Sequence, residues 1–284
     1  MINTWWSNII LYLFLHTVMT QCYKLATKKS KNDGALTVLI LFLSGVFTLF
    51  YIPFFEMKFS SNPLTYICLG IACIFYAISD RTNATARRGL EVSTFSILYQ
   101  FSTVFIFTWG ILFFKEPLVA KKVAGALIIL IVNIAILYRK GKFVLNKYVV
   151  FSMIGNLATS IAISVDVGIS KQFNLALYVA ITFMIPPILI FLMERIQLST
   201  IVNEFKEGNK KAILIVSMIW GITIISMLRA YQFGSVTTIA PLCSLTAILN
   251  VFASYFTLKE KDCMLKKVVL SNLVILGIML IKVG

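Results

Sequence analysis

The chain is a series of long apolar runs separated by short polar and basic stretches. A helix needs roughly 20 apolar residues to cross a bilayer, and ten runs of about that length follow one another. The apolar positions are continuous rather than alternating, so the pattern predicts membrane-crossing helices and not a β-barrel. The predicted spans are Trp5–Tyr23, Ala35–Phe55, Pro63–Asn83, Glu91–Phe114, Leu118–Tyr138, Tyr148–Gly168, Leu175–Met193, Lys211–Ala230, Ser235–Leu258 and Met264–Lys282.

Two segments 144 positions apart begin and end with nearly the same residues. Val92–Thr94 leads through apolar residues to Lys115–Glu116, and Val236–Thr238 leads in the same way to Lys259–Glu260. The chain therefore contains a duplicated membrane unit. Because each unit holds five spans, an odd number, the second unit enters the membrane from the opposite side. The sequence predicts an all-α integral membrane protein with ten transmembrane helices in two inverted five-helix repeats.

The two repeats are predicted as residues 1–141 and 142–284, and the basic stretch Arg139–Lys142 lies at their boundary. No soluble domain fits between the spans, because the longest polar connection, Glu194–Lys210, is too short to bury a core. That connection is typical of a solvated loop or a short surface helix.

Composition supports the membrane setting, since 59% of the residues are hydrophobic, 13% are charged and the mean hydropathy is +0.91. The expected location is the cytoplasmic membrane, as a multi-pass protein that is a monomer or homodimer. The net charge of +15 is dispersed over short loops. Such charges are expected beside anionic lipid headgroups, so no nucleic-acid partner is needed to explain them.

The basic residues also indicate an orientation. When Arg81 and Arg229 are left out because they fall inside predicted spans, the loops after spans one, three, five, seven and nine hold 18 of the remaining 24 Lys and Arg residues. Basic loops stay in the cytoplasm. The charge distribution therefore predicts that both termini lie outside.

Catalytic and metal-binding patterns are missing from the sequence. It has one histidine, five scattered cysteines without CxxC spacing, no GxSxG motif and no phosphate-binding loop. We therefore expect no enzymatic activity, no catalytic residues, no metal and no cofactor.

Polar residues inside the spans are the candidates for function, because each costs a few kcal/mol in hydrocarbon unless it meets a cavity or a partner. His16 is the histidine of the chain, and the ordinary pKa of an imidazole lies near neutral pH. It has two interpretations: a group for proton coupling or substrate contact, or a neutral imidazole that is hydrogen-bonded between helices. Tyr76, Asp80 and Asn83 share a helix face. Asp80 is the leading candidate for coupling or for contact with a cationic group; alternatively, Asp80 and Arg81 mark the helix end.

Further candidates lie on later spans, and each has two interpretations, cavity lining or a hydrogen bond between helices. Asp166 has a weaker claim, because it lies near a span end and could reach headgroup water. Trp220 is either an aromatic cavity wall or simple packing. The remaining candidates are Tyr99, Gln100, which aligns with Ser244 of the second copy, Asn156, Ser160 and Asn250.

Glu116 and Glu260 repeat between the copies, but their position at the junction of two spans argues for a structural role. We expect each to cap the helix that follows it.

The duplicated pattern resembles the EamA domain of the drug/metabolite transporter superfamily. The similarity rests on Ser-Thr followed by an apolar span, Lys115–Pro117 or Lys259–Lys261, and another apolar helix. It covers residues 92–138 and 236–282, with Pro241 where that family often has a proline. The resemblance implies a ten-helix carrier with a central cavity that works by alternating access. It also implies cytoplasmic termini, opposite to the orientation that the charges predict.

The expected function is therefore secondary transport of a small polar metabolite, with or without proton coupling. A flippase or accessory subunit for a lipid-linked glycan is the alternative. Few Lys and Arg residues lie inside the predicted spans, so amino acids or amines are favoured over phosphorylated compounds, which need a basic clamp.

Overall fold

The computed structural model describes residues 4–114, 119–139, 142–143, 145–234, 239, 242–243, 245–260 and 262–283. Within these residues the regular secondary structure is helical, apart from one antiparallel ladder between β1 (Tyr138–Arg139) and β2 (Lys142–Phe143). The helices are α1 (Trp5–Lys29), α2 (Asp33–Leu49), α3 (Pro63–Gly89), α4 (Val92–Tyr99), α5 (Phe101–Phe114), α6 (Ala120–Leu137), α7 (Lys147–Ile169), α8 (Leu175–Met193), α9 (Leu198–Glu207), α10 (Lys210–Phe233), α12 (Thr246–Thr257) and α13 (Met264–Val283), with short 3₁₀ turns η1 (Ile52–Phe54) and η2 (Ser170–Gln172).

Six helical segments among the described residues are long and apolar enough to cross a membrane, which identifies a multi-pass membrane protein. They are Trp5–Lys29, Pro63–Gly89, Val92–Leu112, Lys147–Gln172, Leu175–Met193 and Lys210–Phe233. Three shorter apolar helical segments fall at the second, fifth and ninth predicted spans. These are Asp33–Leu49, Val123–Ile136 and Thr246–Thr257.

Two helices continue well beyond the predicted ends of their spans. The first was expected to end at Tyr23 and the third at Asn83, but α1 runs to Lys29 and α3 runs to Gly89. The apolar run ends where predicted, yet the polar turns beyond it remain helical. Several polar side chains in these turns find partners within the protein, namely Lys24, Thr27, Thr85 and Arg88, so hydropathy alone marks the ends too early.

Two other expectations about the chain can be compared with the structure. The fourth span was expected to be one helix, but it is divided into α4 and α5 at Gln100. The backbone N–H of Gln100 donates to the carbonyl oxygens of Ile97 and Leu98. The connection between α8 and α10 contains α9, so the surface-helix alternative is confirmed. The first Lys-Glu motif, the Val-Thr-Thr motif, Pro241 and Ser244 lie outside the described residues.

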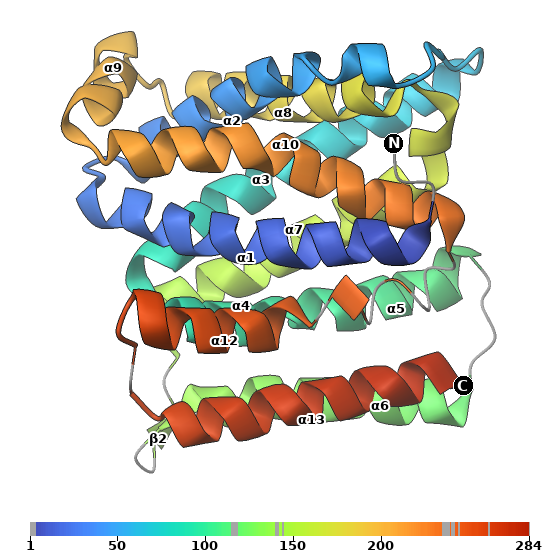
Figure 1. Ribbon diagram of the computed structural model, residues 1–284, viewed down its shortest axis with the longest axis vertical. Coiled ribbons are helices and arrows are strands. Elements are labelled where there is room, and N and C mark those ends of the chain that lie inside the picture. Colours follow the sequence, from blue (N-terminus) through green and yellow to red (C-terminus); the bar gives the residue numbers. More distant parts are fainter. Residues whose placement is uncertain are drawn as a thin grey trace.

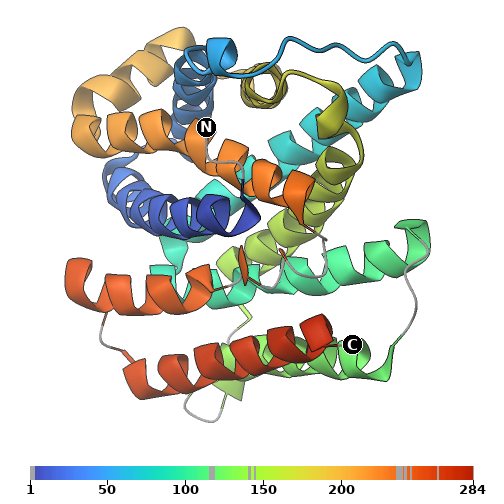
Figure 2. The ribbon, with the colours of Figure 1, turned by 45° about the vertical axis from the view of Figure 1, so that its right-hand side comes forward.

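The helices pack in layers that follow one another along the longest axis of the molecule (Figure 1). One end of this axis holds α2, α8 and α9, and the other holds the pair α6 and α13, which lie side by side in both ribbon views (Figure 2). Between these ends, α3 packs along α7 and α1 packs along α10. These two central pairs position the polar residues described next.

Candidate functional site

A cavity of about 80 Å³ lies among α1, α3, α4, α7, α8 and α10. A single buried water needs roughly 10–15 Å³ of such space, so the cavity has room for several waters or a small solute. Five of the sequence candidates line it. They are His16, Tyr76, Asp80, Tyr99 and Trp220.

Helix α3 supplies the polar wall of the cavity. Tyr76, Asp80, Asn83 and Arg87 follow one another at spacings of four, three and four residues, which places them on one face of the helix. The helix begins where the Asn62 side chain accepts a hydrogen bond from the N–H of Leu64, with Pro63 in its first turn.

Asp80 and Arg87 bring opposite charges into this cavity. Among the residues that the structure describes, neither hydrogen bond nor ion pair joins the two side chains to each other or to a third group. The guanidinium carbon of Arg87 lies 4.9 Å from the ring centroid of Tyr23 and 4.4 Å from that of Phe95. Its Nη1 is buried without an acceptor in the described part of the chain.

Arg87 is the residue that the sequence interpretation missed. It was assigned to a loop, and the expected shortage of basic residues inside the spans was built on that assignment. Because α3 continues to Gly89, Arg87 is a helical residue that lines the cavity. The seven-residue spacing from Asp80, two helical turns, was the signal that could have identified it.

His16 lines the cavity from α1. Its ring centroid lies 5.2 Å from that of Tyr12, one turn earlier, and its Nδ1 is buried without a hydrogen-bond partner among the described residues. The alternative that His16 is hydrogen-bonded between helices therefore has no support at Nδ1. Trp220 approaches from α10, where its ring packs edge-on against Tyr23 and at a steep angle to Phe183.

Asp166 is buried directly behind the cavity wall. Its carboxylate accepts hydrogen bonds of 2.5 Å from the hydroxyls of Tyr76 and Tyr178, and the residue is 1% exposed. The expectation that Asp166 could reach headgroup water is therefore wrong. The physical reason is that two tyrosine donors satisfy the carboxylate inside the bundle.

The other candidates lie outside the main cavity. Gln100 lines an adjoining space of about 40 Å³ that also contacts Tyr12 and Tyr99. Three further candidates make hydrogen bonds between helices: Asn156 Nδ2 donates to the oxygen of Leu98 (2.9 Å), Ser160 Oγ accepts from Trp109 Nε1 (3.0 Å), and Asn250 Oδ1 accepts from Gln21 Nε2 (3.2 Å).

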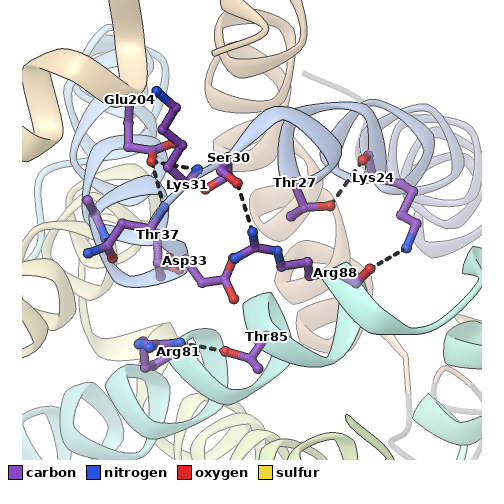
Figure 3. A network of polar contacts seen from close by, with 12 residues as sticks. Lys24, Thr27, Ser30, Lys31, Asp33, Thr37, Arg81, Thr85, Arg88 and Glu204 are labelled. Carbon is purple, nitrogen blue, oxygen red and sulfur yellow. Dashed lines mark hydrogen bonds and ion pairs between the residues drawn. The ribbon is translucent and has the colours of Figure 1, made fainter. Parts of the chain in front are cut away.

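A polar network links α3 and α9 to the turn between α1 and α2 (Figure 3). Arg88 donates to the Asp33 carboxylate at 3.1 Å and to the carbonyl oxygen of Ser30 at 3.0 Å, which ties α3 to the turn between α1 and α2. Arg81 donates to Glu194 at 2.5 Å, which ties α3 to the end of α8. Arg81 therefore has a partner other than its neighbour Asp80.

The comparisons with known proteins identify the fold but not a family. No family model matches the chain, and no curated protein matches it in sequence. Among solved structures, 19 chains are similar. One, described only as a crystal structure of a protein, is 14% identical, with a TM-score of 0.64 over 98% of this chain and 96% of the other. At this identity the likeness concerns the fold alone.

Proposed function

We propose that the protein is a secondary transporter that carries a small polar metabolite across the cytoplasmic membrane by alternating access. The observation that supports this most directly is the cavity between the helices of this multi-pass membrane protein. Asp80, Arg87 and His16 all line it. Ionisable side chains are expensive at membrane depth and are retained mainly where they serve transport or a similar function.

The proposal includes two inverted repeats of five spans each, related to the EamA fold. The helix packing supports this arrangement. If the two repeats are exchanged, α3 takes the place of α10 and α7 takes the place of α1, so the pair α3–α7 becomes the pair α10–α1, and both pairs are closely packed. The pair α5–α7 becomes α12–α1 in the same way, and these pairs also pack together.

Alternating access needs a site that both repeats enclose, so that their rocking exposes it to one side and then the other. The cavity lies among α1, α3 and α4 from the first proposed repeat and α7, α8 and α10 from the second. Enclosure by six helices favours a small solute over a lipid-linked glycan, which needs a cleft open sideways to lipid. Amino acids and amines fit the aromatic and carboxylate lining, and Asp80 and His16 are the proposed coupling groups.

Uptake of labelled metabolites by protein reconstituted into liposomes tests this function. The wild type should accumulate at least one amino acid or amine above the level of protein-free liposomes, and Asp80→Asn should lose most of that uptake. Glu56→Gln is a matched control, because Glu56 is an exposed carboxylate that pairs with Lys58 at the surface. Equal uptake by wild type and Asp80→Asn, or a preference for phosphate esters, would contradict the proposal.

A further inference from the structure

Arg87 is fixed in place by the groups around it. Lys24 Nζ donates to the backbone oxygen of Arg87 itself at 2.5 Å and to that of Leu90 at 2.6 Å, so the last turn of α3 is held from α1. The rings of Tyr23 and Phe95 contact the guanidinium. A cation held by aromatic rings is pre-organised but keeps N–H donors for an acceptor.

The acidic residues near this end of the bundle are engaged elsewhere. Asp33 pairs with Arg88 at 3.1 Å, Glu194 pairs with Arg81 at 2.5 Å, and Glu91 pairs with Lys267 at 2.5 Å. Glu260 accepts backbone hydrogen bonds from the start of α4. Within the described residues, the carboxylate that shares the cavity with Arg87 is Asp80.

Asp80 and Arg87 are seven residues apart, which separates their Cα atoms by roughly 10 Å along α3. Both side chains line the same cavity, and within the described residues neither a hydrogen bond nor an ion pair joins them. The two charged groups therefore face one cavity without being paired with each other. A molecule with a cationic and an anionic group could bridge them.

Resting on the proposed transport function, we propose that Arg87 binds a carboxylate of the transported compound while Asp80 binds its ammonium group, so that the substrate is a zwitterion. The planar fork of a guanidinium matches a carboxylate with two parallel hydrogen bonds. One cation beside one carboxylate suits a singly charged anionic group better than a phosphate. Arg87 is thus a specificity-determining residue that separates zwitterions from simple amines.

Three probes with one carbon skeleton test this assignment. Leucine carries both charged groups, 3-methylbutylamine lacks the carboxylate, and 4-methylpentanoate lacks the amine. Their binding to the purified protein in detergent is measured by equilibrium dialysis of the labelled compounds. We expect Arg87→Gln to weaken leucine and 4-methylpentanoate by at least about tenfold and to leave 3-methylbutylamine unchanged. Asp80→Asn should instead weaken the binding of 3-methylbutylamine and leave that of 4-methylpentanoate unchanged.

Arg88→Gln is the matched control, because it removes the same charge one residue away at a side chain that is 41% exposed and pairs with Asp33. It should leave the relative affinities of the three probes unchanged. Arg87→Lys keeps the charge without the planar fork, and we expect it to bind leucine more weakly than the wild type and more tightly than Arg87→Gln. This variant also provides the test if Arg87→Gln does not fold.

The outcomes separate the inference from the function on which it rests. Equal weakening of all three probes by Arg87→Gln would indicate a merely structural arginine and overturn the assignment, although transport would stand. The assignment would also be overturned if the wild type bound 3-methylbutylamine more tightly than leucine. If the wild type neither binds nor accumulates any of the three probes or the wider set of amino acids and amines, the proposed function fails and the inference fails with it.

Discussion

Glu260 accepts a hydrogen bond of 2.8 Å from the Ser93 hydroxyl, although the two residues lie at opposite ends of the duplicated motif. Its carboxylate also accepts from the backbone N–H groups of Val92 (2.8 Å) and Ser93 (3.1 Å). Glu260 therefore caps the start of α4, and the expectation that it caps the helix following it is wrong. The glutamate at the Lys-Glu end of the second copy therefore caps the helix that begins with Val-Ser-Thr in the first copy. Glu116 and Val236, which would form the reciprocal contact, lie outside the described residues.

Glu260→Gln should lower the free energy of unfolding by about 1 kcal/mol. The amide keeps one acceptor oxygen but loses the negative charge that favours the N-terminal end of a helix. Unfolding of the purified protein in detergent micelles measures the change. Glu56→Gln removes a carboxylate that is 75% exposed, and it should have almost no effect. A loss of equal size in both variants would argue against the cap.

The sequence predicts the membrane class and the helices well because both depend on long apolar runs. It also identifies His16, Tyr76 and Asp80 as separate candidates, because polar groups at membrane depth need a cavity or a partner, and the structure places all three along one cavity. It does not predict Arg87 or the partners of Asp166. Both depend on packing between helices that are distant in the sequence. Lys24 of α1 donates to a carbonyl oxygen in the last turn of α3, and Tyr178 of α8 donates to Asp166 of α7.

Lys24→Met should destabilise the protein by roughly 2–3 kcal/mol. Lys24 is 7% exposed, and its ammonium donates to three carbonyl oxygens at the C-terminal end of α3, those of Arg87, Arg88 and Leu90. Loss of the donor leaves these carbonyls unsatisfied in a buried place. Lys28→Met, at an exposed position on the same helix, should be nearly neutral. Thermal unfolding of both variants in the same detergent makes the comparison.

Gly155→Ala should destabilise the contact between α7 and α3 by about 1–3 kcal/mol. A methyl group at residue 155 would lie 2.5 Å from the side-chain oxygen of Asn83, so either the Asn83 amide must leave its hydrogen bond with Ser79 or the two helices must move apart. Gly168→Ala is a control on the same helix, because a methyl group there meets no atom within 4 Å. Gly168→Ala should be neutral or slightly stabilising. The melting temperatures of the two variants should therefore move apart.

Glu204 and Glu207 lie on the same surface helix, and neutralising them should have unequal effects. Glu204 is 5% exposed and accepts from the backbone N–H groups of Lys31 (2.8 Å) and Asn32 (2.6 Å), whereas Glu207 forms an exposed ion pair with Lys31. We expect Glu204→Gln to lower the melting temperature in low and high salt. Glu207→Gln should have a smaller effect that high salt removes.

The Glu207 pair also has a defined pH dependence. The hydrogen bond with Lys31 lowers the pKa of Glu207, and the same bond raises the pKa of Lys31. Stabilisation by Glu207 is therefore complete above its ordinary pKa of about 4.3 and is lost as the pH falls through the lowered value. Stabilisation by Lys31 is lost only as the pH rises through its raised pKa, above about 10.4. The difference in melting temperature between wild type and Glu207→Gln should be constant from pH 5 to about 10 and shrink in acid.

Tyr76→Phe and Tyr178→Phe should have similar effects on stability but, under the proposed function, different effects on substrate uptake. Each removes one of the two hydroxyl donors to the buried Asp166, so each should destabilise the protein by about 1.5–3 kcal/mol. Tyr76 lines the cavity, whereas Tyr178 is fully buried behind it. Loss of the Tyr76 hydroxyl should therefore also change the apparent affinity for substrate in liposome uptake, while Tyr178→Phe should leave it near the wild-type value. Equal changes in affinity would mean that Asp166 itself, rather than Tyr76, determines the shape of the site.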